Sequence, residues 1–176
     1  RITNVVISHF HPDHINGLTT ADGAAAFPNA EVMVAEPEWR FWTDEGAAAR
    51  ASEGMRPLFA NVANRFRPYQ GRIRQAGADA EIVPGLRLLA APGHTPGHSV
   101  VHVADGSEQM MYVADTTNRP ELLARRPDFH IMFDMDGAQA EATRRRLYDR
   151  IANERMRVAG FHFPFPALGF MAKEGN

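Results

Sequence analysis

The stretch ISHFHPDHINGL, residues 7–18, places three of the chain's eight histidines beside an aspartate, directly after an apolar run. His9 and His11 are two positions apart, so in an extended segment their rings project to the same side. Asp13 and His14 follow after a proline and point elsewhere. One loop therefore offers two pairs of ligands, which suits two neighbouring metal ions better than one. The alternative is a solvated, histidine-rich loop without a metal.

The composition is that of an ordinary globular protein, with 44% hydrophobic and 23% charged residues among 176. A chain of this length suits one domain, residues 1–176. The formal net charge of −2 gives no electrostatic reason to expect nucleic acid or an anionic membrane as partner. The absence of cysteine excludes disulfides and thiolate metal sites. No apolar stretch approaches the roughly 20 residues that a membrane-spanning helix needs.

The order of the expected elements is mixed. Strands are predicted where apolar, β-branched residues run or alternate, and helices where alanine and i, i+4 spacing dominate. Strands are expected at 2–8, 30–36, 80–93, 98–106, 108–117 and from 157; helices at 37–54, 55–70 and 136–156. Asp105-Gly106 between two apolar runs predicts a hairpin turn. The pattern indicates an α/β or α+β layered fold.

Three further polar residues each stand at the end of a predicted strand. His94 lies in the turn-rich APGHTPGHS (91–99), Asp115 ends MYVADTT (111–117), and His162 follows a strand in GFHFPF (160–165). Each alone is more typical of a satisfied polar residue than of a ligand. Together they complete a set of seven: His9, His11, Asp13, His14, His94, Asp115 and His162. Imidazole and carboxylate without sulfur suit Zn²⁺, Fe or Mn in a catalytic role.

These segments resemble the metallo-β-lactamase superfamily, in which an HxHxDH motif, a later His, an Asp and a final His occur in this order. The resemblance runs from residue 1 to about 170. FPNAEVMVAEPEWRFW (27–42), APGHTPGHS (91–99) and FHFPFPALG (161–169) are similar to the branch that contains methyl parathion hydrolase and related lactonases or esterases. The family implies an αββα sandwich with a dinuclear site along one edge of two packed sheets.

The resemblance also implies that strands before the HxHxDH motif and a strand after the final histidine are missing, so we expect an incomplete fragment of a longer chain. Uncovered sheet edges would favour association, and a homodimer is one expectation. Localisation stays open, since a cytoplasmic and an exported protein both fit.

By the family pattern, two divalent ions are bound, zinc being expected first, with Fe, Mn or Co as alternatives. His9, His11 and His94 would hold one ion, Asp13, His14 and His162 the other, and Asp115 would bridge them. A hydroxide between the ions would be the nucleophile, and Asp13 would also be catalytic, orienting it or moving a proton. Ala114 precedes Asp115 where the family more often has glycine.

Several other residues are expected to lie in or near the site. His98 is expected to be a hydrogen-bonding support and His102 a packing or surface residue. Candidates for the substrate pocket are Trp39, Trp42, Phe129, His130 and Phe165, although a structural role is favoured for His130. The run RRR (144–146) lies in a predicted helix and is interpreted as a solvated face.

The resulting hypothesis is a dinuclear hydrolase of a small-molecule, ester-like bond: a lactone, an aryl ester or a phosphotriester. The missing cysteine argues against β-lactamases that use a cysteine ligand. One alternative is a thioester hydrolase that resembles glyoxalase II. The other is a metal-binding domain without catalytic activity.

Overall fold

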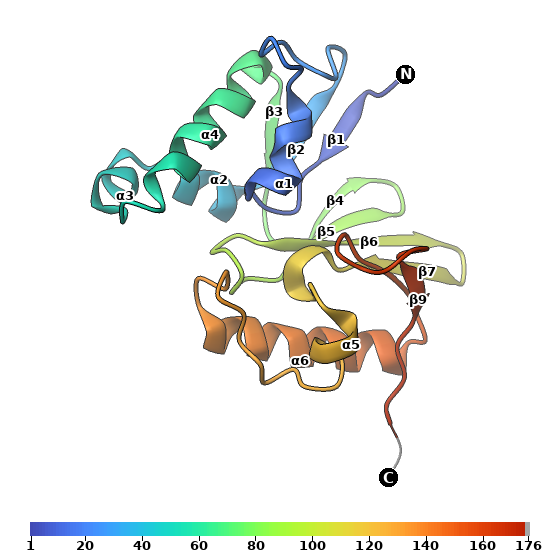
Figure 1. Ribbon diagram of the computed structural model, residues 1–176. Helices are drawn as coiled ribbons and strands as arrows, with labels where there is room; N and C mark the ends of the chain where they lie inside the picture. Colours follow the sequence, from blue (N-terminus) through green and yellow to red (C-terminus); the bar gives the residue numbers. More distant parts are fainter. Residues whose placement is uncertain (175–176) are drawn as a thin grey trace. The chain divides into compact units, whose positions relative to one another are not determined.

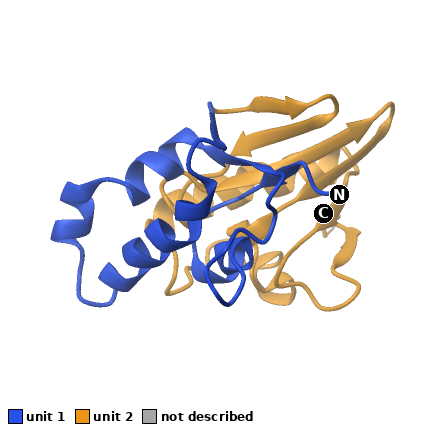
Figure 2. Ribbon diagram, turned by 90° about the horizontal axis from the view of Figure 1, so that it is seen from above, with its two compact units in different colours: residues 1–77 blue, residues 78–176 orange. Residues whose placement is uncertain are grey.

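The computed structural model describes residues 1–174 and divides into two compact units, Arg1–Gly77 and a second unit that begins at Ala78 (Figure 2). Each unit is a β-sheet with helices, so the mixed α/β class is confirmed. The expectation of one domain over 1–176 stays a prediction. Among the residues described, no helix is both long enough and apolar enough to cross a membrane.

The first unit contains a three-stranded parallel sheet of order β1-β2-β3 (Figure 1). The strands are β1 (Asn4–Val6), β2 (Glu31–Ala35) and β3 (Ile73–Ala76), and the helices are α1 (Pro12–Ile15), α2 (Glu36–Trp42), α3 (Glu45–Arg50) and α4 (Arg56–Phe66), with 3₁₀ turns η1 (Asn16–Leu18) and η2 (Arg67–Tyr69). The central strand β2 is buried at Val32, Met33 and Val34, as expected for a parallel strand covered on both faces.

The second unit contains a six-stranded sheet of order β4-β5-β6-β7-β8-β9, antiparallel except for the parallel pair β7-β8. Its strands are β4 (Ala80–Val83), β5 (Leu86–Ala90), β6 (Ser99–Asp105), β7 (Glu108–Tyr112), β8 (Arg157–Ala159) and β9 (Leu168–Phe170). The helices are α5 (Pro120–Leu123) and α6 (Gly137–Asn153), with one 3₁₀ turn, η3 (Ala114–Thr116). The predicted hairpin is present between β6 and β7, but its turn is Gly106-Ser107, one residue later than expected, because Asp105 still pairs with Glu108.

Helix α6 closes the core of the second unit. Leu147 and Ile151 are buried and belong to the same apolar cluster as Val100 and Met111 of the sheet. Asp136 caps the helix, because its side chain accepts a hydrogen bond from the Gln139 amide at 2.9 Å. The helix therefore presents one face to the sheet and also anchors the loop that precedes it.

Several predicted boundaries were wrong for local reasons. The expected helix over 37–54 is split into α2 and α3, because the Asp44 side chain caps α3 by accepting from the Ala47 amide. The first strand spans only Asn4–Val6 and is exposed or half-buried, since it lies at the edge of its sheet. Helix α6 ends at Asn153, so Arg155, which has a φ of 52°, is outside the helix. Strands β3 and β9 and helix α5 were not predicted.

Two backbone positions with positive φ follow the ends of β5 and β7. Gly93 has a φ of 130°, and a Cβ built on it would lie 2.2 Å from the amide nitrogen of Ala140 in α6. Ala114 has a φ of 44° and is fully buried, so an L-residue occupies a left-handed conformation there. Glycine adopts this conformation without a steric penalty. This is a physical reason why the family that the sequence resembles more often has glycine where this chain has Ala114.

We predict that Gly93→Ala lowers the free energy of unfolding by at least about 3 kcal/mol, because it adds overpacking to a left-handed strain. Chemical denaturation measures the change. Gly169→Ala is the matched control in the same unit, since a Cβ at Gly169 meets nothing within 4 Å. Equal effects of the two substitutions would contradict the close approach of Gly93 to α6.

Ala114→Gly should cost less stability than the same substitution at Ala91, which is also buried but has no positive φ. Removing a buried methyl and adding backbone freedom costs roughly 1.5 kcal/mol at an ordinary position. Relief of the left-handed strain returns about 1 kcal/mol at Ala114. Denaturation curves of both variants test this difference, and equal losses would show that Ala114 is not strained.

Candidate metal centre

In the first unit, the chain leaves β1 and places three imidazoles close together before and within α1. The ring centroids of His9 and His11 are 4.9 Å apart, and those of His9 and His14 are 4.1 Å apart. His9 is fully buried, and the Ser8 hydroxyl lies 3.1 Å from its Nδ1. Pro12 starts α1 directly after His11, which fixes where the loop turns into helix. The predicted grouping of these side chains is therefore present.

Asp13 and His14, the second pair of the motif, are also in contact. Asp13 Oδ2 lies 3.3 Å from His14 Nε2. The Asp13 side chain is 47% exposed, whereas that of His14 is almost completely buried. A carboxylate in this position can bind a ligand on one side and exchange protons with solvent on the other.

A buried glutamate that the sequence did not point to supports this loop. Glu38 of α2 is 1% exposed, and its Oε1 accepts a hydrogen bond from the Phe10 amide at 2.9 Å and from Trp42 Nε1 at 2.8 Å. Phe10 stands between His9 and His11, so the carboxylate fixes the backbone from which both imidazoles project. The EPEW sequence resembles an ordinary first helical turn and gave no signal of this role.

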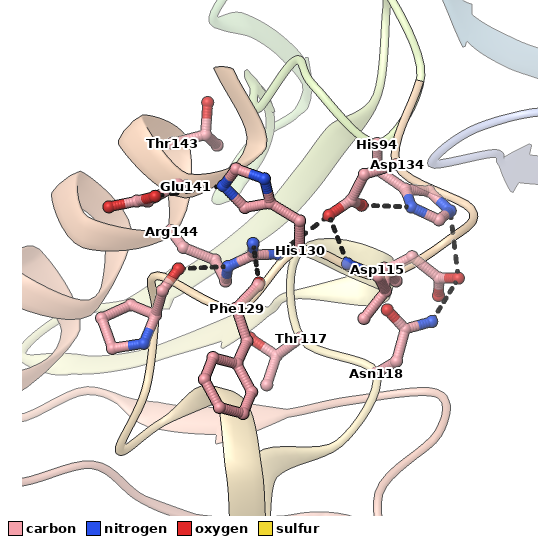
Figure 3. Close-up of polar contacts among 12 residues, drawn as sticks. His94, Asp115, Thr117, Asn118, Phe129, His130, Asp134, Glu141, Thr143 and Arg144 are labelled. Atoms are coloured by element: carbon pink, nitrogen blue, oxygen red, sulfur yellow. Dashed lines mark hydrogen bonds and ion pairs between the residues drawn. The ribbon is translucent and has the colours of Figure 1, made fainter. Parts of the chain in front are cut away.

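In the second unit, three side-chain nitrogens converge on one oxygen. Asp115 Oδ2 lies 3.3 Å from His94 Nε2, 3.4 Å from His162 Nε2 and 2.9 Å from Asn118 Nδ2. Figure 3 shows Asp115 between His94 and Asn118. His94 and Asp115 are buried, and the His162 side chain is 35% exposed. The three later residues of the predicted set are thus brought together, with Asn118 as an addition.

His98 holds this arrangement from behind, in agreement with its predicted supporting role. Its Nδ1 lies 3.0 Å from the Ala91 carbonyl oxygen, and its Nε2 accepts a hydrogen bond from the Asp115 amide at 3.2 Å. A carbonyl can only accept, so the proton of His98 is on Nδ1. His102 instead pairs with Gln109 across the β6-β7 hairpin at 2.8 Å, as expected for a packing residue.

The other ring nitrogen of His94 contacts a carboxylate. His94 Nδ1 is 3.0 Å from Asp134 Oδ1, and Asp134 Oδ2 is 3.4 Å from Arg144 (Figure 3). Burial lowers the pKa of His94, but the hydrogen bonds and charges of Asp115 and Asp134 outweigh it and raise this pKa to about 9. Burial raises the pKa of Asp134, yet His94 and Arg144 hold it below its ordinary value.

The interpretation of residues 144–146 as a solvated face was wrong for Arg144, which is completely buried. The two following arginines are exposed, so the helix turns the first one inward and leaves the others in solvent. Sequence reasoning missed Arg144 because a charged run in a helix is usually solvated, and it missed Asp134 because an aspartate in a loop is usually exposed.

The five residues proposed for a substrate pocket lie in different surroundings, and their role stays a prediction. Trp42 is buried and Trp39 half-buried in the apolar core of the first unit. Phe129 is 39% exposed below the guanidinium of Arg126, and Phe165 is 99% exposed. His130 Nε2 lies 3.1 Å from Glu141 on α6, which agrees with the structural role favoured for it.

The donor set fits divalent metal ions. Two ligand atoms that each lie about 2.0–2.2 Å from one zinc ion at a tetrahedral angle are about 3.3–3.6 Å apart. The pairs Asp13–His14, His94–Asp115 and His162–Asp115 have separations of 3.3, 3.3 and 3.4 Å. Ordinary N–H···O hydrogen bonds are shorter, near 2.9–3.0 Å. Both units thus present nitrogen and oxygen ligands at the spacing of a shared ion.

The chain is similar in sequence to curated N-acyl homoserine lactonases of Bacillus. An N-acyl homoserine lactonase of Bacillus thuringiensis is 31% identical over 99 residues, 56% of this chain and 32% of the relative. One from Bacillus sp is 33% identical over 94 residues, 53% of this chain and 30% of the relative. The matched part therefore spans about a third of the length of these curated relatives.

Two solved structures are similar over 98% of this chain, each at 28% identity. One, described as hydrolase AbOPH in the beta lactamase superfamily, has a TM-score of 0.90, and 60% of it is covered. The other is AidC, described as a dizinc quorum-quenching lactonase in complex with a product, with a TM-score of 0.88 and 61% covered. The family model "Metallo-beta-lactamase superfamily" matches residues 1–162. This chain therefore belongs to the metallo-β-lactamase superfamily.

Proposed function

We propose that this chain is the metal-binding part of a dinuclear hydrolase that cleaves an ester-like bond in a small molecule, with a lactone as the first candidate substrate. The observation that carries the proposal is the spacing of ligand pairs in both units: three nitrogen–oxygen separations of 3.3–3.4 Å. Membership of the superfamily and the lactonase relatives support it.

The family pattern assigns the seven side chains to two ions. His9, His11 and His94 would hold one ion, Asp13, His14 and His162 would hold the other, and Asp115 would be shared. The geometry of the second unit supports the sharing, because His94 and His162, assigned to different ions, both approach the same oxygen of Asp115. Zinc is the first choice for a set of imidazoles and carboxylates, with Fe, Mn and Co as alternatives.

When bound, a pair of divalent ions would lower the pKa of a water molecule towards neutrality and polarise the carbonyl or phosphoryl oxygen of the substrate. The side chains of the chain itself have further tasks. Asp13, with a half-exposed carboxylate next to His14, would accept and release protons at the solvent side. His98 and Glu38 would keep the ligands in place through backbone amides.

The lactone class is favoured by the named relatives and by the exposed apolar side chains in the loops that carry ligands or their partners. Phe165 follows His162 in one loop, and Met132 and Phe133 precede Asp134 in another, with exposures of 99, 89 and 63%. These side chains offer apolar contacts to an uncharged substrate and no positive charge to an anionic one. Aryl esters and phosphotriesters stay as further candidates.

Asp115→Ala should lower the bound metal from about two ions per chain to one or none. It should reduce hydrolysis by more than the roughly 10–100-fold that loss of an outer-shell partner costs. Metal analysis after dialysis and initial rates on a lactone measure both effects. Asp149→Ala, which removes an exposed carboxylate of α6, serves as the control and should change neither. Full metal content in Asp115→Ala would refute the shared-ligand assignment.

A panel of lactones, aryl esters, phosphotriesters and thioesters, tested with the zinc-loaded protein, identifies the substrate class. We expect the highest kcat/KM on lactones, and removal of metal by a chelator should abolish turnover until zinc is added back. Preference for thioesters would replace the lactone proposal, and bound metal without turnover on the whole panel would indicate a catalytically silent domain.

A further inference from the structure

We propose that Asp134, held by Arg144, is a positioning residue that fixes the imidazole of His94 so that its Nε2 faces the metal. The inference rests on the proposed metal centre and adds two residues to it. Neither belongs to the HxHxDH set, and both were outside the predicted site. They come from the loop before α6 and from α6 itself (Figure 3).

The first step concerns the carboxylate. The Asp134 side chain is 1% exposed, and its two oxygens have different partners: Oδ1 lies 3.0 Å from His94 Nδ1 and Oδ2 lies 3.4 Å from the guanidinium of Arg144. The contact with the imidazole is the shorter one. Asp134 therefore does more than neutralise the charge of Arg144, because its Oδ1 contacts His94.

The second step concerns the arginine. Besides Asp134, its guanidinium donates to the carbonyl of Pro127 at 3.2 Å and to that of Phe129 at 2.8 Å. A buried charge is costly unless it is paired and hydrogen-bonded. The planar fork of Arg144 meets this condition with three acceptors from one loop, and thereby fixes where the loop places Asp134.

The third step concerns the backbone. The amides of Met135 and Asp136 donate to the carbonyls of His94 and Gly93 at 3.2 and 2.9 Å, and the Thr143 hydroxyl donates to the Pro92 carbonyl at 2.7 Å. The loop that carries the carboxylate and the turn that carries the histidine are thus joined independently of their side chains. The contact between Asp134 and His94 is preorganised by helix α6.

The consequence for the metal follows from the chemistry of imidazole. A proton on Nδ1 that is donated to a carboxylate leaves Nε2 as the ligand atom and also orients the ring. His94 Nε2 lies 3.3 Å from Asp115 Oδ2, on the side where the other ligands of this unit converge. Without Asp134 the ring could rotate or take the other tautomer, and metal affinity would fall.

The decisive experiment compares zinc affinity, measured by competition with a chelator, in the full chain and three variants. Asp134→Ala should weaken binding by roughly 10–100-fold. Asp134→Asn should weaken it less, because its amide oxygen still accepts the Nδ1 proton. Asp128→Asn is the control, since it changes an exposed carboxylate of the same loop that pairs only with Arg126 among the contacts described. The absorption spectrum of the cobalt-substituted protein should shift in Asp134→Ala and stay unchanged in the control.

A measurement on the metal-free wild-type protein separates this inference from the proposed function. The Nδ1 proton of His94, identified by its correlation to nitrogen-15, should give a strongly deshielded proton resonance that Asp134→Ala removes, because the contact with the carboxylate is 3.0 Å long. Zinc affinities within twofold in all variants, or an unprotonated Nδ1 in the wild type, would overturn the positioning role. A wild type with the Nδ1 resonance but without bound zinc would overturn the proposed function and leave the contact established.

Discussion

The second unit depends on how it surrounds one buried carboxylate oxygen. His94, His162 and Asn118 all point a nitrogen at Asp115 Oδ2, and a carboxylate removed from water must be compensated by such partners. The backbone next to this carboxylate is strained, because Ala114, directly before Asp115, has a left-handed conformation. The polar cluster and a positive φ therefore occur together at the end of β7.

Charges in this unit alternate along a buried chain of contacts. Arg144 pairs with Asp134, Asp134 with His94, and His94 with Asp115. Each charged group has an opposite neighbour, which lowers the cost of burial for all of them. The hydrogen bonds and charges of Asp115 and Asp134 raise the pKa of His94, so that a positive charge is favoured between these two carboxylates.

In the first unit, too, a buried carboxylate supports the proposed ligands. Glu38 is buried below the histidine loop and accepts from the Phe10 amide and the Trp42 indole. In the first unit, Glu38 of α2 holds the ligand loop by accepting a hydrogen bond from its backbone. In the second unit, Asp134 before α6 contacts the imidazole of a ligand, His94. The ligand sets are thus supported by the packing of α2 and α6 on their sheets.

The mixed α/β class, most strands and helices and the four ligands of residues 9–14 could be predicted from the sequence, because they depend on local spacing and on the alternation of apolar residues. His94, Asp115 and His162 could be proposed because each stands at the end of a predicted strand. The sequence misplaced Arg144 and gave no sign of Glu38 or Asp134. Phe10 lies 28 positions from Glu38, His94 lies 40 from Asp134, and Asp134 lies 10 from Arg144. A local pattern describes such charged side chains as solvated. Only the tertiary structure brings the distant partners together and makes their burial favourable.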